Sequence, residues 1–347
     1  MESNENQTEK RKTEHIEIVL NRKVSGSGIT TGFEKYRFVH QALPETRYAD
    51  ISLATNFLGK SLKAPFLISS MTGGTDKAAK INQNLAAAAQ AQGWAMGLGS
   101  VRAAIEHPET ATTFNVRKVA PTIPILANLG AVQLNYGYGV DHCRQAVELS
   151  EADGLVFHLN SLQEVFQPEG NTDFRNLLRK LEDLCSVLEI PVGVKEVGWG
   201  IDGETARRLF DVGVDFVDVA GAGGTSWSQV EKYRSENPLL FQVAEAFESW
   251  GHPTSDCIRE GRALNPEGTL IASGGLNNGV DGAKAIALGA DLAGYGRSLL
   301  KAATAPTPDA IASQLERIET ECRIAMFGTG IDRIEVLKGT ERIEKVE

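Results

Sequence analysis

The chain has 347 residues, of which 42% are hydrophobic and 23% charged, a balance typical of a globular protein and unlike that of a disordered or membrane-spanning chain. Its formal charge of −10, from 35 Lys and Arg against 45 Asp and Glu, disfavours nonspecific binding to nucleic acid. No apolar run reaches the ~18 residues of a membrane helix, the polar N-terminus does not resemble a secretory signal, and the four cysteines form no CxxC pair; we therefore expect a cytoplasmic protein that binds neither nucleic acid nor a membrane.

The first part of the chain predicts an extension that precedes the main domain. Residues 1–10 are polar and partly acidic, and we expect them to form a disordered leader. The next ten residues predict a helix that starts with two adjacent cations, Arg11 and Lys12. Taken alone, such a pair is typical of a solvated helix terminus. Residues 11–63 form the N-terminal extension of a single domain whose barrel covers 64–347.

From residue 64 onward, apolar runs of strand length alternate with helical patterns. The runs lie at 64–70, 94–98, 123–127, 154–159, 191–194, 214–219, 269–273 and 291–295. Helices are predicted near 76–92, 108–119, 139–151, 173–188, 202–212 and 277–288, with another after residue 297. Strands that alternate with helices imply a parallel sheet, and these repeats predict an α/β fold, the closed (β/α)8 TIM barrel. An open Rossmann sheet is the alternative, but no GxGxxG follows the first strand.

One connection is much longer than the others. Residues 226–253 separate the sixth predicted strand from the elements that follow it. Compact barrels use short connections, and a long one at the catalytic end is commonly a lid or a packing surface. We therefore expect a long loop after strand 6.

Polar or glycine residues follow nearly every predicted strand. They are Ser70 and Thr72, Ser100 and Arg102, Asn128, His158 and Asn160, Lys195, Thr225, Gly274 and Gly275, and Gly296. The active site of a barrel lies at the C-terminal ends of its strands. No single residue in this set is specific, but their convergence predicts a site at that end.

The fourth strand ends in an unusual concentration of polar groups. Strand alternation puts His158 and Asn160 on one face, and Gln163 and Glu164 follow in the loop just beyond. All four can bind protons, metals or polar ligands, although the same pattern fits a capped strand end that bonds nearby backbone. As a Mg²⁺ ligand, Glu164 would need no second carboxylate, because Mg²⁺ keeps waters and substrate phosphates as its other ligands.

The loops after the last two predicted strands are rich in glycine. Gly274 and Gly275 follow the seventh strand, and Gly296 with Arg297 follows the eighth. Such loops hold a phosphate in many barrels, because glycines let backbone N–H groups approach it and a helix N-terminus adds its positive end. We predict a phosphate site here, with plain tight turns as the alternative.

Lys195 ends an apolar strand and would lie inside the barrel, where an unpartnered cation is costly. It could form a Schiff base, bind an anion or contact the edge of a cofactor, and an ion pair with Glu196 is the structural alternative. Three other chemistries are excluded, because the sequence contains no HExxH zinc helix, no GxSxG elbow and no P-loop lysine.

Together these motifs resemble the type 2, flavin-dependent isopentenyl-diphosphate isomerases. The matching stretches run from residue 11 past residue 297 and are Arg11-Lys12-x-x-His15, Met71-Thr72-Gly73-Gly74, Gly99-Ser100-Val101-Arg102, Ala127-Asn128-Leu129-Gly130, His158-Leu159-Asn160 with Gln163-Glu164, Val194-Lys195-Glu196-Val197-Gly198, Gly223-Gly224-Thr225, Ala272-Ser273-Gly274-Gly275 and 285–290. The motifs at the last two strands also occur in other FMN barrels. Two positions depart from the family pattern: Val101, where relatives often carry a polar residue, and Gly294-Tyr295-Gly296-Arg297, where Gly-Met-Ala is expected.

The resemblance implies that FMN lies across the barrel mouth. Its ring would be lined by Ser70, Met71 and Thr72, with Ser100, Asn128 and Lys195 at the ring's polar edge. Its ribityl phosphate would be held by Thr225, Gly274, Gly275, Leu276, Gly296 and Arg297.

The resemblance also implies a small-molecule substrate, isopentenyl diphosphate, which proton addition and removal convert to dimethylallyl diphosphate in isoprenoid biosynthesis. Reduced FMN, Mg²⁺ on Glu164, and NADPH as reductant would be needed. The substrate contacts would be Arg11, Lys12, His15, Ser100, Val101, Arg102, His158, Asn160 and Gln163. Flavin N5 is the leading proton donor and acceptor, with His158, Gln163 and Glu231 as candidate catalytic side chains. Because the Arg-Lys pair closes a neighbouring subunit's site in this family, a homo-oligomer, a tetramer or an octamer, is implied.

Three other functions fit parts of the pattern. An FMN-dependent 2-hydroxy-acid oxidase would need a catalytic histidine with arginines after the sixth strand, and residues 222–227 contain neither. A Schiff-base aldolase would use Lys195. A non-catalytic barrel would bind flavin or phosphate without turnover.

Overall fold

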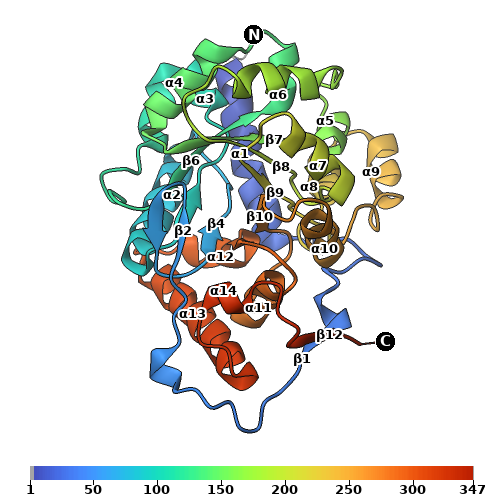
Figure 1. Ribbon diagram of the computed structural model, residues 1–347. Coiled ribbons are helices and arrows are strands. Elements are labelled where there is room, and N and C mark those ends of the chain that lie inside the picture. Colours follow the sequence, from blue (N-terminus) through green and yellow to red (C-terminus); the bar gives the residue numbers. More distant parts are fainter. Residues whose placement is uncertain (1–3, 347) are drawn as a thin grey trace.

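The computed structural model describes residues 4–346, which form a barrel of eight parallel strands surrounded by helices (Figure 1). The order around the barrel is β10-β11-β4-β5-β6-β7-β8-β9, so the first barrel strand pairs with the last. The strands are β4 (Phe66–Ile68), β5 (Ala95–Gly97), β6 (Ile125–Gly130), β7 (Gly154–His158), β8 (Val192–Lys195), β9 (Phe216–Asp218), β10 (Thr269–Ala272) and β11 (Leu292–Tyr295). The predicted α/β fold, a (β/α)8 barrel, is confirmed.

Two apolar layers hold the barrel together, because successive strand side chains point to opposite faces. In β7, Val156 belongs to the cluster inside the barrel, whereas Leu155 and Phe157 pack between the strands and the helices. Gly193 on β8 makes room for the interior ring of Phe216, since an added Cβ would lie 2.0 Å from Phe216 Cε2.

A hairpin closes the bottom of the barrel, at the N-terminal ends of the strands. It consists of β2 (Thr55–Phe57) and β3 (Lys60–Leu62). Phe57 is buried and meets Phe216 edge to face, with ring centroids 5.4 Å apart. The hairpin therefore completes the interior cluster and leaves the opposite end of the barrel for a site.

Helices surround the barrel. They are α2 (Asp76–Gln92), α4 (Val140–Ser150), α6 (Leu177–Cys185), α7 (Gly203–Asp211), α11 (Gly279–Ala287), α12 (Arg297–Ala303), α13 (Asp309–Thr329) and α14 (Ile334–Leu337). Side chains cap the N-termini of α2, α7 and α11. Thr75 caps α2 by accepting a hydrogen bond from Ala78 N, and Asp202 caps α7 in the same way. No helix within residues 4–346 is long and apolar enough to cross a membrane.

The N-terminal extension is more regular than the sequence suggests. Helix α1 spans Asn4–Asn21, so the disordered leader expected over 1–10 is wrong for residues 4–10, whereas residues 1–3 lie outside the described part. Glu, Gln and Lys in this stretch are good helix formers, which lets the helix start early. Farther along, β1 (Tyr36–Phe38) pairs with β12 (Ile343–Lys345) and joins the extension to the other end of the chain.

The long connection expected after strand 6 is present, and its residues are largely helical. Its residues form α8 (Trp227–Arg234) and α9 (Pro238–Glu245), and α10 (Thr254–Leu264) follows. Pro238 sits at the first turn of α9, and the side chain of Asn237 accepts a hydrogen bond from Leu239 N. Asn237 and Pro238 therefore start a helix in this segment.

Two other local predictions need correction. The helix expected near 108–119 is replaced by α3 (Arg102–Glu106) and a 3-10 helix over Pro108–Phe114, because Pro108 cannot donate the N–H that would continue α3. Gln163 and Glu164, expected in a loop, lie in α5 (Ser161–Phe166).

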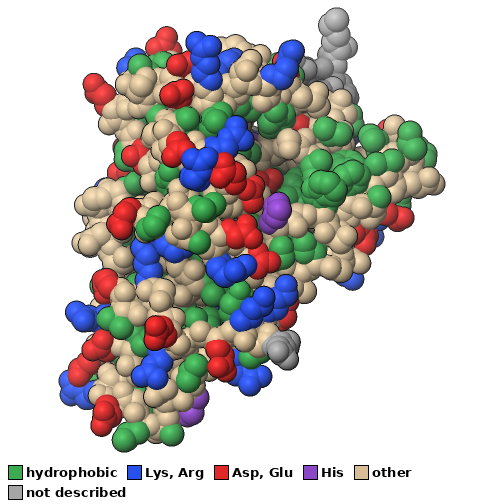
Figure 2. Space-filling model, turned by 45° about the vertical axis from the view of Figure 1, so that its right-hand side comes forward, with side chains coloured by type: hydrophobic (Ala, Val, Ile, Leu, Met, Phe, Trp, Pro, Cys, Tyr) green, Lys and Arg blue, Asp and Glu red, His purple; other side chains and the backbone are tan. Residues whose placement is uncertain are grey.

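Hydrophobic side chains gather on one face, and this face comes forward when the side that carries α9 is turned to the viewer (Figure 2). On and near α9, the large apolar side chains of Leu239, Phe241, Val243 and Trp250 are exposed. They contribute little to the core of this chain.

The hairpin predicts a stability effect that is separate from the site. Phe57→Ala should lower the free energy of unfolding by about 3–5 kcal/mol, because it removes a buried ring and leaves a cavity beneath the barrel. Leu43→Ala, at a residue with 76% exposure, is the control and should change it by about 0.5 kcal/mol or less. Urea unfolding followed by far-UV circular dichroism measures both, and equal effects would contradict the role of the hairpin.

Candidate active site

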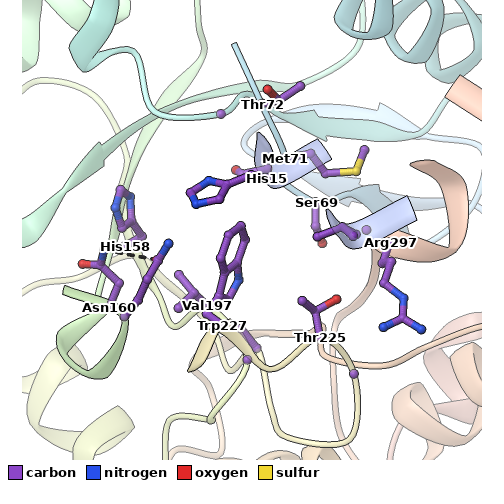
Figure 3. Close-up of a pocket in the computed structure, with 18 of the residues that line it drawn as sticks. His15, Ser69, Met71, Thr72, His158, Asn160, Val197, Thr225, Trp227 and Arg297 are labelled. Atoms are coloured by element: carbon purple, nitrogen blue, oxygen red, sulfur yellow. Dashed lines mark hydrogen bonds between the residues drawn. The ribbon is translucent and has the colours of Figure 1, made fainter. Parts of the chain in front are cut away.

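A cavity of about 350 Å³ opens at the C-terminal ends of the barrel strands. Most of the predicted site residues line it: Arg11, Lys12, His15, Ser70, Met71, Thr72, Ser100, Arg102, Asn128, His158, Asn160, Gln163, Glu164, Lys195, Thr225, Gly274, Gly275, Leu276, Gly296 and Arg297. Its volume and mixed lining are typical of a cofactor or substrate site. Figure 3 shows His158 and Asn160 on one side, Met71, Ser69 and Arg297 on the other, and His15 and Trp227 between them.

Two predicted residues lie outside this lining. Val101 is fully buried in the core, and its N–H donates to the carbonyl of Asn128. Its side chain therefore cannot contact a substrate, although the peptide helps to place Asn128. Glu231 reaches the cavity indirectly, through hydrogen bonds to Gln163 and His15.

Helix α1 forms one wall of the cavity of its own chain. Arg11, Lys12, His15, Ile16 and Val19 all face the barrel strand ends. The family resemblance implies that the Arg-Lys pair closes a neighbouring subunit, but in this structure the helix covers the barrel to which it is joined. The site therefore has its cationic wall within a single chain.

Lys12 carries a buried ammonium group. Its Nζ has no hydrogen-bond partner among residues 4–346 and lies 5.5 Å from the ring centre of Phe114. Burial, with the nearby charges of Arg11 and Arg102, lowers the pKa of Lys12 to about 7. A buried cation with no partner is costly, so the arrangement favours an incoming anion.

His158 is held as a neutral ring. Burial and the charge of Lys195 lower the pKa of His158 to about 3. Its Nδ1 donates to Asn128 Oδ1 at 2.7 Å, which leaves a lone pair on Nε2. In this state Nε2 accepts a hydrogen bond, and the ring would donate to a phosphate only after it gains a proton.

Glu164 projects from the first turn of α5 and is partly exposed. Its Oε1 accepts from Asn160 Nδ2 at 2.8 Å, and its Oε2 accepts from Asn171 N at 2.5 Å. Both donors are neutral, and each oxygen keeps a second lone pair. The described residues contain no group of three or more His, Cys, Asp or Glu side chains that could hold a metal, so a cation on Glu164 would need ligands from elsewhere.

Glycines shape the opposite end of the cavity. Gly275 has φ +83°, and a Cβ there would lie 2.5 Å from Thr31 Cγ2 and 2.9 Å from the carbonyl of Gly223. Two hydroxyl oxygens nearby, Ser69 Oγ and Ser298 Oγ, are buried without a partner in the part of the chain that the structure describes. Open backbone and unpaired hydroxyls at one place fit an oxygen-rich group such as phosphate.

Lys195 is buried at the end of β8, and its Nζ donates to the carbonyl of Glu196. The ion pair with the Glu196 carboxylate, which was the structural alternative for Lys195, is therefore not formed. Instead, Glu196 Oε2 accepts from the N–H groups of Val197, Gly198, Trp199 and Gly200. Burial, opposed by these donors, raises the pKa of Glu196 to about 7.

Sequence reasoning missed several lining residues. Ser25, Ser69, Val197, Trp227 and Ser298 line the cavity but were not predicted as site residues. The Gly223-Gly224-Thr225 motif ends two residues before Trp227 and is the signal that could have identified it. Ser25 comes from far along the chain, and only folding brings it to Arg297, whose Nη1 donates to it at 3.0 Å.

Comparisons with known sequences point to one family. A family model of FMN-dependent dehydrogenases matches residues 5–117 and 149–344. An isopentenyl-diphosphate delta-isomerase of Oceanobacillus iheyensis is 54% identical over 333 residues, which cover 96% of this chain and 95% of that protein. Proteins of the same name from Nostoc sp. and Rickettsia bellii are 48% and 49% identical, and the matches cover 98% and 96% of this chain and 97% and 96% of those proteins.

Solved structures of similar fold are oxidases and a related flavoprotein. A lactate oxidase of Pediococcus acidilactici has a TM-score of 0.68 at 16% identity, with coverage of 99% of this chain and 93% of that chain. A mutant flavocytochrome b2 with pyruvate bound has a TM-score of 0.70 at 17% identity and coverage of 95% and 82%. A mandelate oxidase variant with a monooxide FMN adduct has a TM-score of 0.66 at 18% identity and coverage of 99% of both chains. At these identities the likeness concerns the fold alone.

The Lys12 environment predicts pH-dependent anion binding. The cationic form is present below a pKa of about 7, so affinity for a dianion should fall as the pH rises through 7, and binding above pH 7 should take up a proton. Sulfate is a suitable probe because it does not titrate in this range. Lys12→Met should weaken sulfate binding about 10-fold or more, since a charged hydrogen bond contributes about 1.5–3 kcal/mol.

Calorimetry in buffers of different ionisation enthalpy measures both affinity and proton uptake. Lys10→Met, at an exposed residue of the same helix, is the matched control and should behave like the unaltered protein. If Lys12→Met binds sulfate with unchanged affinity and unchanged proton uptake, Lys12 is not the anion-binding group.

Proposed function

This chain belongs to the isopentenyl-diphosphate delta-isomerases of the FMN-dependent dehydrogenase family, and from that premise we propose that it interconverts isopentenyl and dimethylallyl diphosphate. The reaction would add and remove protons, with reduced FMN and Mg²⁺, in isoprenoid biosynthesis, and NADPH would reduce the flavin. The observation that carries the proposal is the unpartnered Lys12 ammonium buried beside Arg11 and Arg102. It supports an anionic ligand at the mouth of an otherwise acidic protein.

The cavity fits FMN at two ends. The glycine cradle at Gly223, Gly274 and Gly275, together with the unpaired hydroxyls of Ser69 and Ser298, would hold the phosphate. Met71, Asn128 and Lys195 would contact the ring, where a buried lysine can favour negative charge. Reduced FMN supplies an electron-rich ring whose N5 can exchange a proton with a substrate.

The diphosphate and Mg²⁺ would share the other end. Arg11, Lys12 and Arg102 would bind diphosphate oxygens, and an incoming anion would favour the protonated, donating form of His158. Mg²⁺ would sit on Glu164, with diphosphate oxygens and waters as its remaining ligands. Asn160 and the N–H of Asn171 would orient that carboxylate.

Near the reacting carbons, the protein would orient the substrate and exclude water. His15, Gln163 and Trp227 border the cavity, and the carboxylate of Glu231 lies behind the first two. Gln163 donates to Glu231 at 3.1 Å, which fixes the direction of its amide. We propose Gln163 and Glu231 as helpers in proton handling, while His158 binds the diphosphate.

A homo-oligomer of four or eight copies also belongs to this proposal. It follows from the family resemblance, and the apolar side chains exposed around α9 would suit contacts between copies. Because α1 lines the cavity of its own chain, a neighbour is not needed to supply Arg11 and Lys12.

An FMN-dependent 2-hydroxy-acid oxidase is the rival, since the similar structures include lactate and mandelate oxidases. Such an enzyme would need a histidine base with arginines after β9. Residues 222–227 there contain neither, and the relatives at about 50% identity are isomerases by name.

Isomerisation is tested directly in an anaerobic assay with FMN, NADPH, Mg²⁺ and isopentenyl diphosphate. The product should be dimethylallyl diphosphate, and no conversion by protein shown to hold reduced FMN would overturn the proposal. Glu164→Gln should lower kcat/KM about 100-fold or more and weaken the Mg²⁺ dependence, because it removes a charged ligand. FMN binding should be unchanged. Glu109→Gln, at an exposed carboxylate, is the control.

The phosphate cradle makes a separate prediction about FMN. Gly275→Ala should weaken FMN binding about 10-fold or more, because the new methyl group clashes with the Gly223 backbone and distorts the cradle. Gly137→Ala is the matched control: Gly137 also has positive φ, +92°, but a Cβ there has nothing within 4 Å. Flavin fluorescence titration measures the affinity, and equal behaviour of the two variants would place the phosphate elsewhere.

A further inference from the structure

A charged hub lies directly behind the cavity, and its central residue, Arg234, has no part in the roles above. Arg234, in the last turn of α8, donates to three carboxylates. Its Nη1 reaches Glu231 Oε2 at 2.6 Å, within the same helix. Its Nε reaches Glu14 Oε2 on α1 at 3.2 Å, and its Nη2 reaches Glu169 Oε1, just after α5, at 3.3 Å. One guanidinium thus joins the elements that carry the substrate-side residues.

The strongest arm of this hub is buried. The side chain of Glu231 is 0% exposed and that of Arg234 is 11% exposed, whereas those of Glu14 and Glu169 are 36% and 44% exposed. Exposed ion pairs contribute little, but removing one partner of a buried pair leaves an uncompensated charge. The Arg234–Glu231 contact therefore dominates, and the two outer arms act as weaker ties to α1 and α5.

The other oxygen of Glu231 faces the cavity wall. Its Oε1 accepts from Gln163 Nε2 at 3.1 Å and from His15 Nε2 at 2.9 Å. His15 in turn meets Trp227 edge to face, with ring centroids 5.1 Å apart. Burial acts to raise the pKa of Glu231, but His15, Arg234 and Gln163 together hold it below its usual value. These groups come from α1, α8 and α5, the elements packed around the carboxylate.

We propose that Arg234 is a positioning residue that orients the Glu231 carboxylate between His15 and Gln163 and latches α1 over the cavity. The guanidinium suits this role, because its planar fork holds three N–H donors in fixed directions, one toward each carboxylate. The catalytic part of this inference rests on the proposed isomerase function. The latch does not, since it concerns contacts within the protein.

The latch is tested without any turnover, by amide hydrogen exchange on the FMN-loaded protein. Arg234→Met should speed exchange in α1 about 10-fold or more while exchange in the barrel strands stays unchanged, because α1 loses its tie through Glu14 and its ordered partner for His15. Arg234→Lys should restore protection only in part. The control is Lys232→Met, two residues away on α8, because Lys232 pairs with Glu245 on α9 and neither residue lines the cavity. Unchanged α1 exchange in Arg234→Met would overturn the latch.

The positioning role is tested through the pH dependence of kcat/KM. Without Arg234, the pKa of Glu231 should rise, so the inflection of the profile should move to higher pH whether the ionised or the protonated form is active. Glu231→Gln removes that ionisation, so adding Arg234→Met to it should cause no further shift.

An Arg234→Met profile that superimposes on that of the unaltered protein, or a shift that persists in the Glu231→Gln background, would overturn the positioning role. If the unaltered protein showed no isomerisation at all, the proposed function would fail, whereas the hydrogen-exchange result would still decide the latch.

Discussion

The site depends on holding several cations together at the mouth of the barrel, although their mutual repulsion tends to displace helix α1, which carries two of them. Arg11 and Lys12 approach Arg102 from α1, and their mutual repulsion helps to lower the pKa of Lys12. Like charges repel strongly where water is scarce. Glu169, which also lines the cavity, lies 3.5 Å from Arg11 and partly offsets this repulsion, and Glu231 accepts a hydrogen bond from His15 on the same helix.

This arrangement explains how an acidic chain can suit a diphosphate. The net charge of −10 is a property of the whole chain. Recognition of an anion depends instead on the few cationic side chains at the mouth of the cavity that lose water when the anion binds. The Nζ of Lys12 has no hydrogen-bond partner within the described residues, so a bound anion would supply the interaction that this group lacks. At the other end, the cradle uses no cation beyond Arg297 and relies on backbone approach, which only glycine permits at Gly275.

Much of the fold and of the lining could be predicted, because both follow from local patterns. Apolar runs of strand length that alternate with helical patterns predict the barrel. Because the C-terminal ends of parallel strands must meet, Asn128, His158 and Lys195 could be placed at one mouth. What escaped prediction depends on contacts between distant segments. In the sequence, Arg234 resembles an ordinary surface cation. Its role becomes visible only when α1 and α5 fold against it.

Two residues within recognised motifs, Val101 and Glu196, also differ from expectation, because the folded backbone decides their surroundings. Val101 lies between two lining residues, but the turn into α3 directs its side chain to the core. Glu196 follows Lys195, and this proximity suggests an ion pair. The Glu196 carboxylate instead accepts hydrogen bonds from four consecutive backbone N–H groups, because the loop itself fixes these donors in place. Sequence proximity gives candidates, and the backbone geometry decides between them.

Two carboxylates flank Gln163, and their surroundings separate their roles. Glu231 is fully buried, and its charge is already matched by Arg234 and supported by His15, so a dication brought there would meet a neutralised group and a positive guanidinium. Glu164 is partly exposed and receives only neutral donors, so its charge remains available to a cation. A metal bound on Glu164 would lie on the side of the cavity lined by His158 and Asn160. The hydrogen bonds around Gln163 therefore leave the carboxylate of Glu164 on α5 available to a metal, whereas the carboxylate of Glu231 on α8 holds the wall in place.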